Sequence, residues 1–288
     1  MKEVKRKLLI TLGILLLTIC FLYFQNNAIV TTKLSIRSDA IPRDFDGYRL
    51  VQLSDLHSKS FGKDQYKLVQ KVRQVQPHLI VFTGDLVDSK KYNEETSLKL
   101  MEQLVQIAPV YFVTGNHEWW SGKFDSLEDQ LIDMGVNVLR NTVAEITHEN
   151  GDGAGGKIQL VGIDDPANAN EAYAERSMTE EALKNSLTSL KESDNFTVLL
   201  AHRPELFSLY SQYEMDLVFS GHAHGGQVRL PFVGGVIAPN QGLFPDYTSG
   251  KYTQDETTMI VNRGLGNSII PFRIFNRPEI ILVTLETE

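Results

Sequence analysis

The chain of 288 residues contains only one cysteine, Cys20. A single cysteine cannot form an internal disulfide, and a structural thiolate metal site needs several cysteines. Any bound metal ion is therefore expected to have oxygen and nitrogen ligands. The bulky Ile19 before Cys20 does not fit the small-residue site that precedes a lipidated cysteine. Cys20 is therefore interpreted as an inert residue of an apolar segment.

Positive charge is also scarce. The sequence has 28 lysine and arginine residues against 36 aspartate and glutamate residues, a formal net charge of −8. Residues 1–7 hold four of the basic residues and one acidic residue, which leaves 24 basic and 35 acidic residues and a net charge of −11 downstream. Proteins that bind nucleic acid gather lysine and arginine on one face. Bulk nucleic-acid binding is therefore not expected.

One long apolar run is present, at residues 8–24, which are 17 residues without a charge. This is about the shortest length that crosses the roughly 30 Å hydrocarbon core of a bilayer. We expect one transmembrane helix here, with the lipid bilayer as its partner. Four basic residues in 1–7 precede the run, and only Lys33 and Arg37 follow it closely. The positive-inside rule therefore predicts a cytoplasmic end at 1–7 and an extracytoplasmic domain downstream.

A cleavable signal peptide is the competing interpretation of this run. Residues 25–28 (Gln-Asn-Asn-Ala) offer no small residue at the position three before a cleavage point. An uncleaved anchor is therefore favoured, which makes the chain a single-pass protein of the cell membrane.

The rest of the chain has the pattern of one α/β domain. Residues 25–47 are interpreted as a polar connector and residues 48–288 as a single domain. Short apolar runs alternate with amphipathic stretches, which is typical of strands alternating with helices. Strands are predicted at 48–53, 79–83, 110–114, 136–139, 142–147, 158–163, 196–200, 217–219, 259–262 and 280–285. Helices are predicted at 63–75, 94–107, 125–134 and near 179–190.

Five of the predicted strands end at a motif rich in Asp, Asn or His. The motifs hold five of the seven histidines, and only His78 and His148, interpreted as structural, lie elsewhere. Open α/β sheets place their ligand-binding crevice at the carboxyl ends of the strands. The motifs are Asp55-Leu56-His57, Gly84-Asp85-Leu86-Val87-Asp88, Gly115-Asn116-His117-Glu118, Ala201-His202-Arg203-Pro204 and Ser220-Gly221-His222-Ala223-His224.

These residue types favour a site for two divalent metal ions. In an extended segment Asp55 and His57 project to the same side and can approach one ion. The Asp85 carboxylate has two oxygens and can bridge two cations. Neutral imidazoles and an amide oxygen complete the coordination without repelling an anionic substrate. Such ligands accept Mn, Fe, Zn, Co or Ni, so the identity of the metal stays open.

Taken in this order, the motifs resemble those of the calcineurin-like metallophosphoesterases, over residues 48–285. Three further motifs resemble the membrane-anchored bacterial branch, often grouped with UDP-2,3-diacylglucosamine pyrophosphohydrolases: His202-Arg203-Pro204, His224-Gly225-Gly226-Gln227 and Asn262-Arg263-Gly264-Leu265-Gly266. The resemblance implies a four-layer αββα sandwich preceded by the transmembrane helix. It also implies two metal sites that share Asp85, namely Asp55, His57, Asp85 and His224, and Asp85, Asn116, His202 and His222.

The expected function is that of a membrane-anchored, metal-dependent phosphoesterase. Two divalent cations about 3.5–4 Å apart lower the pKa of a bridging water towards about 7, and the resulting hydroxide attacks phosphorus. The bond is a phosphoester or pyrophosphate, in a small-molecule or lipid-linked phosphate such as a lipid-linked sugar nucleotide. The resemblance leaves His117 without a metal, and its imidazole is suited to donating a proton to the leaving group. Asp88 and Glu118 are interpreted as groups that orient ligands or backbone.

Two other functions compete with this one. A catalytically silent scaffold on the same fold would bind without turnover, but silent relatives typically lose metal ligands and this chain has every expected one. An oxygen-activating metalloenzyme usually has a mononuclear site, whereas a bridging carboxylate is expected here.

Several neighbouring residues allow two interpretations each. Arg203 and Arg263 either contact phosphate or pair with a carboxylate. Trp119 and Trp120 either wall the substrate site or pack beneath their loop.

The remaining candidates lie outside the motifs. Asp164 and Asp165 are better interpreted as a turn than as further metal ligands. Phe244, Phe272 and Phe275 either rim a lipid-binding surface or hold long loops in place.

Overall fold

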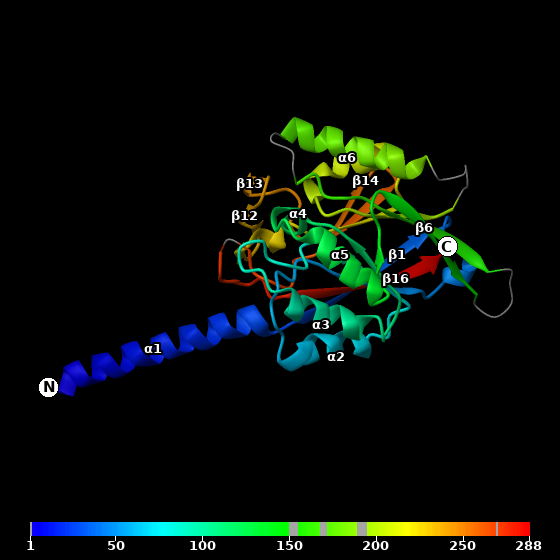
Figure 1. Ribbon diagram of the computed structural model, residues 1–288. Coiled ribbons are helices and arrows are strands. Elements are labelled where there is room, and N and C mark those ends of the chain that lie inside the picture. Colours follow the sequence, from blue (N-terminus) through cyan, green and yellow to red (C-terminus); the bar gives the residue numbers. More distant parts are fainter. Residues whose placement is uncertain (1, 150–154, 168–171, 189–194, 269) are drawn as a thin grey trace.

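Two six-stranded sheets pack face to face in the computed structural model, which describes residues 2–149, 155–167, 172–188, 195–268 and 270–288 (Figure 1). The strands of the first sheet lie in the order β1–β16–β2–β3–β4–β5, and β2 to β5 run parallel. Their bounds are β1 Val30–Ser38, β2 Arg49–Leu53, β3 Leu79–Thr83, β4 Val110–Val113, β5 Asn137–Val138 and β16 Glu279–Thr287.

The second sheet has the order β14–β15–β9–β8–β7–β6. Its four central strands run parallel, and both edge strands are antiparallel to their neighbours. The bounds are β6 Thr142–His148, β7 Gly156–Gly162, β8 Thr197–Leu200, β9 Leu217–Ser220, β14 Gly250–Gln254 and β15 Thr257–Val261. Four two-residue strands form two small hairpins beside it, β10 (Arg229–Leu230) with β11 (Gly234–Gly235) and β12 (Ile237–Ala238) with β13 (Gly242–Leu243).

Side chains that alternate along each strand divide the core into three apolar layers. In β3, Val81 faces the second sheet and packs in one cluster with residues such as Phe219, whereas Ile80 faces the helices on the other side. Both faces of the central strands are buried, which explains why these strands read as continuous apolar runs. The outer helices that cover the first sheet are α2 (Tyr66–Gln74), α3 (Glu94–Leu104) and α5 (Phe124–Asp133), and those that cover the second are α6 (Ala172–Leu187) and α7 (Phe207–Gln212). The predicted αββα sandwich is confirmed.

The predicted connector at residues 25–47 differs in the structure. Its residues Val30–Ser38 form β1, which pairs in parallel with β16 along its whole length, from Val30 opposite Glu279 to Ser38 opposite Thr287. Only Ile36 of this edge strand is buried, so the local sequence carries little apolar signal. The strand that β1 pairs with lies at the far end of the chain, where no local pattern reveals the pairing.

The apolar run begins the chain as α1 (Lys2–Asn27), a helix longer than the predicted 8–24. It is long and apolar enough to cross a membrane by length and composition. Its apolar side chains are exposed, and Figure 1 shows it projecting away from the sandwich. The described part of the chain leaves most of this helix uncovered, which fits association with a membrane. α6 also begins earlier than predicted, at Ala172, and the last two residues of the helix predicted at 179–190 lie outside the described residues.

Candidate metal centre

The five polar motifs converge where the two sheets open at the carboxyl ends of their parallel strands. The first sheet contributes the residues that follow β2, β3 and β4, and the second sheet contributes those that follow β8 and β9. By contrast, His78 lies at the opposite end of the strands, where it contacts Arg49 and the ring of Tyr48. The predicted site residues that meet are Asp55, His57, Asp85, Asn116, His117, His202, His222 and His224.

Hydrogen bonds join the two sheets directly below these side chains. The Gln52 amide donates to the carbonyl oxygen of Ser220 at 2.9 Å, and Asn262 donates to the carbonyl of Gln52 at 3.2 Å. Nδ1 of His202 lies 2.6 Å from the carbonyl oxygen of Thr83, which leaves its Nε2 facing the centre. Because these contacts are buried, they fix the separation of the two sheets at this edge.

The backbone at the centre is unusual, because five site residues have positive φ angles. Asp55, His57, Asp85, His222 and His224 have φ between 47° and 63°. Such conformations cost about 1–3 kcal/mol each in a non-glycine residue and persist only where the surrounding structure enforces them. The prediction that Asp55 and His57 lie in an extended segment is therefore wrong. Both come after the end of β2, in a left-handed turn that aims their side chains at the centre.

Gly84 shows why a glycine precedes the central aspartate. Its φ is +85°, and an added Cβ would lie 2.5 Å from the backbone nitrogen of Gly115. Any side chain at position 84 would push the loop after β3 away from the loop after β4. The glycine thus lets the two loops approach closely enough to bring Asp85 and Asn116 together.

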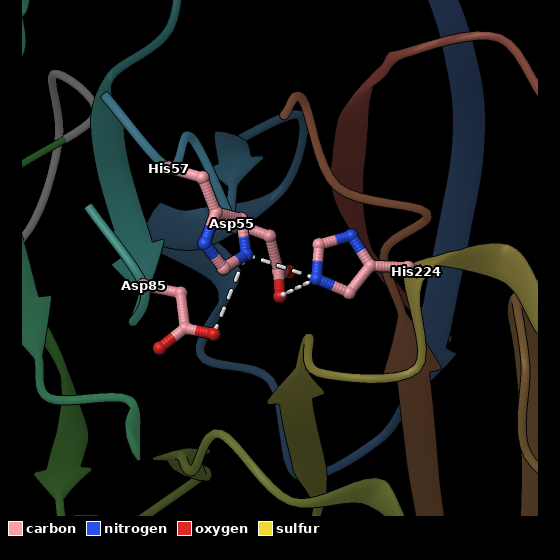
Figure 2. Close-up of side chains that lie close together, drawn as sticks. All are labelled: Asp55, His57, Asp85 and His224. Carbon is pink, nitrogen blue, oxygen red and sulfur yellow. Dashed lines mark hydrogen bonds and ion pairs between the residues drawn. The ribbon is translucent and has the colours of Figure 1, made fainter. Parts of the chain in front are cut away.

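The first cluster joins Asp55, His57, Asp85 and His224 (Figure 2). Nε2 of His57 lies 3.0 Å from Nε2 of His224 and 3.5 Å from Oδ2 of Asp85. Nε2 of His224 lies 3.3 Å from Oδ1 of Asp55. All four side chains are buried, so two nitrogens and two carboxylates point at one small volume.

The second cluster lies on the other side of Asp85. Oδ2 of Asp85 is 3.3 Å from Nε2 of His202, which is 3.2 Å from Nδ1 of His222. The same carboxylate oxygen therefore borders both clusters. His222 and His224 belong to different clusters although only Ala223 separates them, because the chain turns through two left-handed residues.

Several polar atoms of the two clusters lack a suitable hydrogen-bond partner in the described part of the chain, and a pair of bound cations would satisfy them. Among the residues that the structure describes, buried Oδ1 of Asn116 has no hydrogen-bond partner. Two pairs of imidazole nitrogens also lie close together, His57 with His224 at 3.0 Å and His202 with His222 at 3.2 Å, and each pair can share only one proton between its two nitrogens. Bound cations would satisfy the amide oxygen and the paired nitrogens together.

Protonation in the metal-free protein reflects the same crowding. Burial raises the pKa of Asp55 to about 7 and lowers the pKa of His57 to about 4. Burial alone would also lower the pKa of His202, but the carboxylates of Asp85 and Asp55 outweigh it and raise this pKa to about 10. A proton on His202 thus compensates the buried carboxylates, which is the role that a cation would take over.

Glu118 holds the two loops of the first sheet together, as predicted for a residue that orients the backbone. Its carboxylate is fully buried and accepts the backbone N–H groups of Gly115 at 2.7 Å, Asp85 at 2.8 Å and Val87 at 3.2 Å. Burial raises the pKa of Glu118 to about 8, and the nearby charge of Asp85 adds to this effect. The exact position of Asp85 therefore depends on Glu118.

His117 lies beside the two clusters, in a third group of possible metal ligands with His57 and Asp88, and one of its ring nitrogens already has a partner. Its Nδ1 accepts the backbone N–H of Ser89 at 3.0 Å, so the ring proton belongs on Nε2. Its own backbone N–H donates to Oδ1 of Asp85 at 2.8 Å. Because the imidazole lines the main cavity, its Nε2–H is available to a bound molecule.

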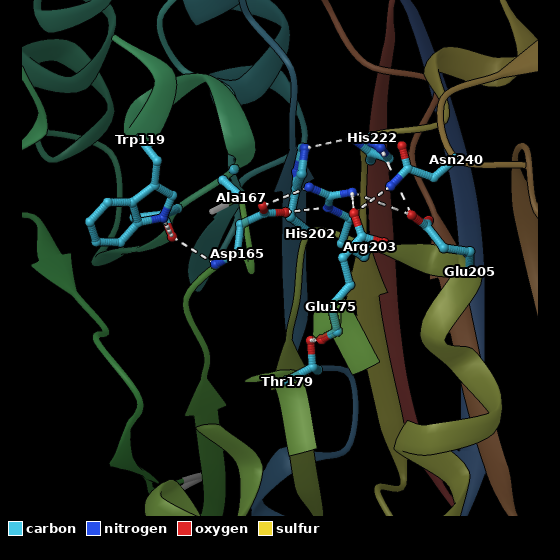
Figure 3. Close-up of polar contacts among 12 residues, drawn as sticks. Trp119, Asp165, Ala167, Glu175, Thr179, His202, Arg203, Glu205, His222 and Asn240 are labelled. Carbon is cyan, nitrogen blue, oxygen red and sulfur yellow. Dashed lines mark hydrogen bonds and ion pairs between the residues drawn. The ribbon is translucent and has the colours of Figure 1, made fainter. Parts of the chain in front are cut away.

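Arg203 forms ion pairs with carboxylates (Figure 3). It is not among the described residues that line the cavity. Its guanidinium makes two contacts with Asp165, at 2.6 and 2.9 Å, and a third with Glu175 at 3.2 Å. Arg263 likewise pairs with Glu279 at 2.7 Å. Of the two interpretations of these arginines, pairing with a carboxylate is the one that the structure shows. Asp165 is buried and belongs to none of the groups of possible metal ligands that the described residues form.

Glu205 is a site residue that the sequence did not reveal. Both of its carboxylate oxygens are buried without a hydrogen-bond partner among the described residues, and Oε1 lies 3.7 Å from the Arg203 guanidinium and 3.9 Å from Nε2 of His222. Burial raises the pKa of Glu205 to about 7. Since Nδ1 of His222 faces the cluster, its Nε2 side is where a carboxylate would orient the ring. An acidic residue two positions after Arg203 was visible in the sequence, but nothing in the local pattern indicated that its side chain points towards His222.

A cavity of about 510 Å³ opens directly onto both clusters. This volume suits a ligand of the size of a nucleotide or a lipid headgroup. Three lysines that the sequence motifs did not indicate also line this cavity, namely Lys59, which is partly buried, and the exposed Lys90 and Lys91. Burial lowers the pKa of Lys59 to about 7.

The two tryptophans have separate roles. Trp120 is exposed and lines the cavity. Trp119 instead packs under its loop, against the ring of Phe124, and donates to Thr114. Packing beneath the loop is therefore confirmed for Trp119, whereas Trp120 lies on the wall of the cavity.

An αββα sandwich with two ligand clusters joined by one carboxylate defines a candidate dinuclear metal site of the metallophosphoesterase type. The sequence matches the family described as calcineurin-like phosphoesterase over residues 48–226, and the chain belongs to this family.

Three relatives illustrate the range of similar proteins. The chain is 31% identical over 269 residues to the "Uncharacterized metallophosphoesterase YkuE" of Bacillus subtilis (strain 168), which covers 92% of this chain and 88% of that protein. It is 30% identical to the "Transmembrane protein with metallophosphoesterase domain" of Danio rerio, over 86% of this chain and 55% of that protein. It is 26% identical to the "UDP-2,3-diacylglucosamine pyrophosphatase LpxG" of Chlamydia muridarum (strain MoPn / Nigg), over 91% of this chain and 90% of that protein.

Proposed function

We propose that this protein is a membrane-anchored hydrolase of phosphoester or pyrophosphate bonds that uses two divalent metal ions. The observation that supports it best is the position of Asp85 Oδ2, within 3.5 Å of His57 Nε2 and 3.3 Å of His202 Nε2. One carboxylate oxygen then serves two metal sites. Asp55, His57, Asp85 and His224 would hold one ion, and Asp85, Asn116, His202 and His222 the other.

Once bound, such a pair of ions polarises phosphoryl oxygens and lowers the pKa of a water from near 16 towards about 7. The protein supplies the remaining functions. Lys90 and Lys91 attract an anionic substrate to the mouth of the cavity. His117 offers its Nε2–H to the oxygen that leaves, which stabilises the developing negative charge.

Metal removal and re-addition tests the proposal. The full-length protein in detergent, stripped with a chelator, is expected to lose hydrolysis of p-nitrophenyl phosphate and of bis-p-nitrophenyl phosphate and to regain it with Mn²⁺. The buried Asp85→Asn variant should stay inactive with Mn²⁺. The exposed Asp64→Asn variant is the matched control and should recover fully. Metal uptake without turnover of either compound beyond a metal blank would favour a silent binding scaffold instead.

The physiological substrate is proposed to be a lipid-linked phosphate or pyrophosphate. α1 supports attachment to a membrane, and one relative is named for hydrolysis of a lipid-linked sugar nucleotide. The charge bias around α1 predicts that the domain lies outside the cytoplasm, whereas lipid precursors of that kind are normally made on the cytoplasmic leaflet. We therefore give the topology more weight than the name of the relative, and propose a lipid phosphate that is reachable from the outer face.

Protease treatment of intact cells tests the side of the membrane. Digestion of the domain without cell lysis is the expected result, and a domain that is cut only after lysis would place it in the cytoplasm. The substrates present on the side identified would then be assayed with the purified full-length protein.

A further inference from the structure

Six large apolar side chains are exposed on the loops after β9 and β15, which also supply Pro239 and Pro271 to the lining of the cavity. Monomeric soluble proteins rarely expose a large contiguous apolar surface without using it for binding. We call these side chains the apolar patch: Leu230, Phe232, Val233, Leu243, Phe244 and Phe272.

The backbone connects the segments that carry the apolar patch. Phe232 and Val233 lie in the turn between β10 and β11, and Leu243 ends β13. Backbone hydrogen bonds link Phe244 N–H to Val236 O at 2.8 Å and Arg229 N–H to Ile274 O at 3.0 Å.

The same loops are tied to the metal centre. The buried Asn276 side chain donates to the carbonyl oxygens of His224 at 2.7 Å and Gln227 at 2.9 Å. The position of the apolar patch relative to the metal centre is therefore fixed by these hydrogen bonds.

The end of α1 lies against this region. The ring of Phe21 is 5.6 Å from that of Phe275, and the guanidinium of Arg277 lies 5.3 Å from the ring of Phe24. Figure 1 shows α1 leaving the sandwich on the side that carries β12 and β13. A bilayer that α1 crosses would therefore lie near residues 272–277, the segment that begins with Phe272 of the apolar patch.

We propose that the apolar patch sits in the headgroup region of the bilayer that α1 crosses, so that the cavity opens towards lipid headgroups. Aromatic and basic side chains favour this depth of a membrane. Lys59 adds a direct link, since it lines the cavity and donates to the carbonyl oxygen of Asn26 at the end of α1. The inference rests on the membrane attachment proposed above and extends it, because the phosphate that the cavity receives would belong to a lipid headgroup.

Fluorescence quenching by lipids tests this placement on the full-length protein. Single cysteines are introduced in a Cys20→Ser background as Phe232→Cys, Leu243→Cys and, as the control, Ile132→Cys on α5. Leu243 is 68% exposed and Ile132 is 54% exposed, so both positions accept a label without disturbing the core. Each variant carries an environment-sensitive dye and is reconstituted into phosphatidylcholine and phosphatidylglycerol vesicles, with or without lipids that bear a nitroxide near the headgroup.

Labels at 232 and 243 are expected to lose most of their fluorescence in nitroxide vesicles, whereas the label at 132 keeps it. Adding Phe244→Asp should weaken the quenching at 232. Equal quenching at all three positions in vesicle-bound protein would overturn the placement of the apolar patch. Protein that does not float with vesicles would overturn the membrane attachment and this inference together. Turnover of bis-p-nitrophenyl phosphate by the same samples reports separately on the proposed hydrolase.

Discussion

His117→Ala is expected to separate catalysis from metal binding. The imidazole lines the cavity and uses Nδ1 to accept the Ser89 N–H, which leaves Nε2 for a bound molecule. The contact with Asp85 comes from the backbone N–H of residue 117, which alanine retains. Asp85 should therefore stay in place, and the purified variant should bind as many metal ions per chain as the unaltered protein.

The structure allows the expected losses of stability and of turnover on this substitution to be estimated. Stability should fall by about 0.5–1.5 kcal/mol, the usual net value of one hydrogen bond, because Ser89 loses its acceptor. Turnover should fall roughly 10²–10⁴-fold, the usual contribution of a positioned general acid. This corresponds to about 2.7–5.4 kcal/mol in the activation barrier, at about 1.36 kcal/mol for each tenfold change. The catalytic loss should thus exceed the loss of stability.

The assay compares leaving groups. p-Nitrophenolate leaves without a proton at neutral pH, so its phosphodiester should be affected least, whereas an alkyl phosphodiester should show the full loss. His148→Ala is the matched control, since His148 packs on Tyr48 away from the centre, and its turnover should not change. Loss of a metal ion from His117→Ala, or equal losses with both leaving groups, would refute the role in protonating the leaving group.

Three further predictions concern the same centre. Asp85→Ala should abolish binding of both ions, measured as metal content, and one retained ion would contradict the shared carboxylate. Glu118→Gln should lower the free energy of unfolding of the metal-free protein by about 1–3 kcal/mol in a denaturant titration, because at least one buried N–H loses its acceptor. The raised pKa values of Asp55, Glu118 and His202, about 7, 8 and 10, outweigh the opposite shift of Lys59 to about 7, so the folded chain binds more protons than the unfolded chain between about pH 6.5 and 8. The melting temperature of the metal-free protein should therefore fall across this range and recover with Mn²⁺, and a rising melting temperature without metal would contradict these shifts.

Much of the centre could be foreseen because its residues follow strands that are readable from local patterns. β3 is a continuous apolar run, and Asp85 follows it by two residues. The carboxyl ends of parallel strands meet at one edge, so the motifs after β2, β3, β4, β8 and β9 were expected to converge. The sequence likewise determined that any metal ligands are oxygen and nitrogen atoms, since a single cysteine excludes a thiolate site. It also determined the apolar helix α1.

Tertiary structure alone decided the features that depend on partners distant in the chain. The predicted connector at 25–47 contains the strand β1 because it pairs with β16, some 250 residues later in the chain. Arg203 turns away from the cavity because Asp165 and Glu175 surround it, and Glu205 faces His222 although nothing in the local pattern aims it there. Loop contacts also decided that the end of α1 lies beside Phe275 and Arg277. Strands and apolar runs are set by neighbours a few residues away, whereas the direction of a polar side chain depends on charges and hydrogen-bond partners that only the folded chain brings near it.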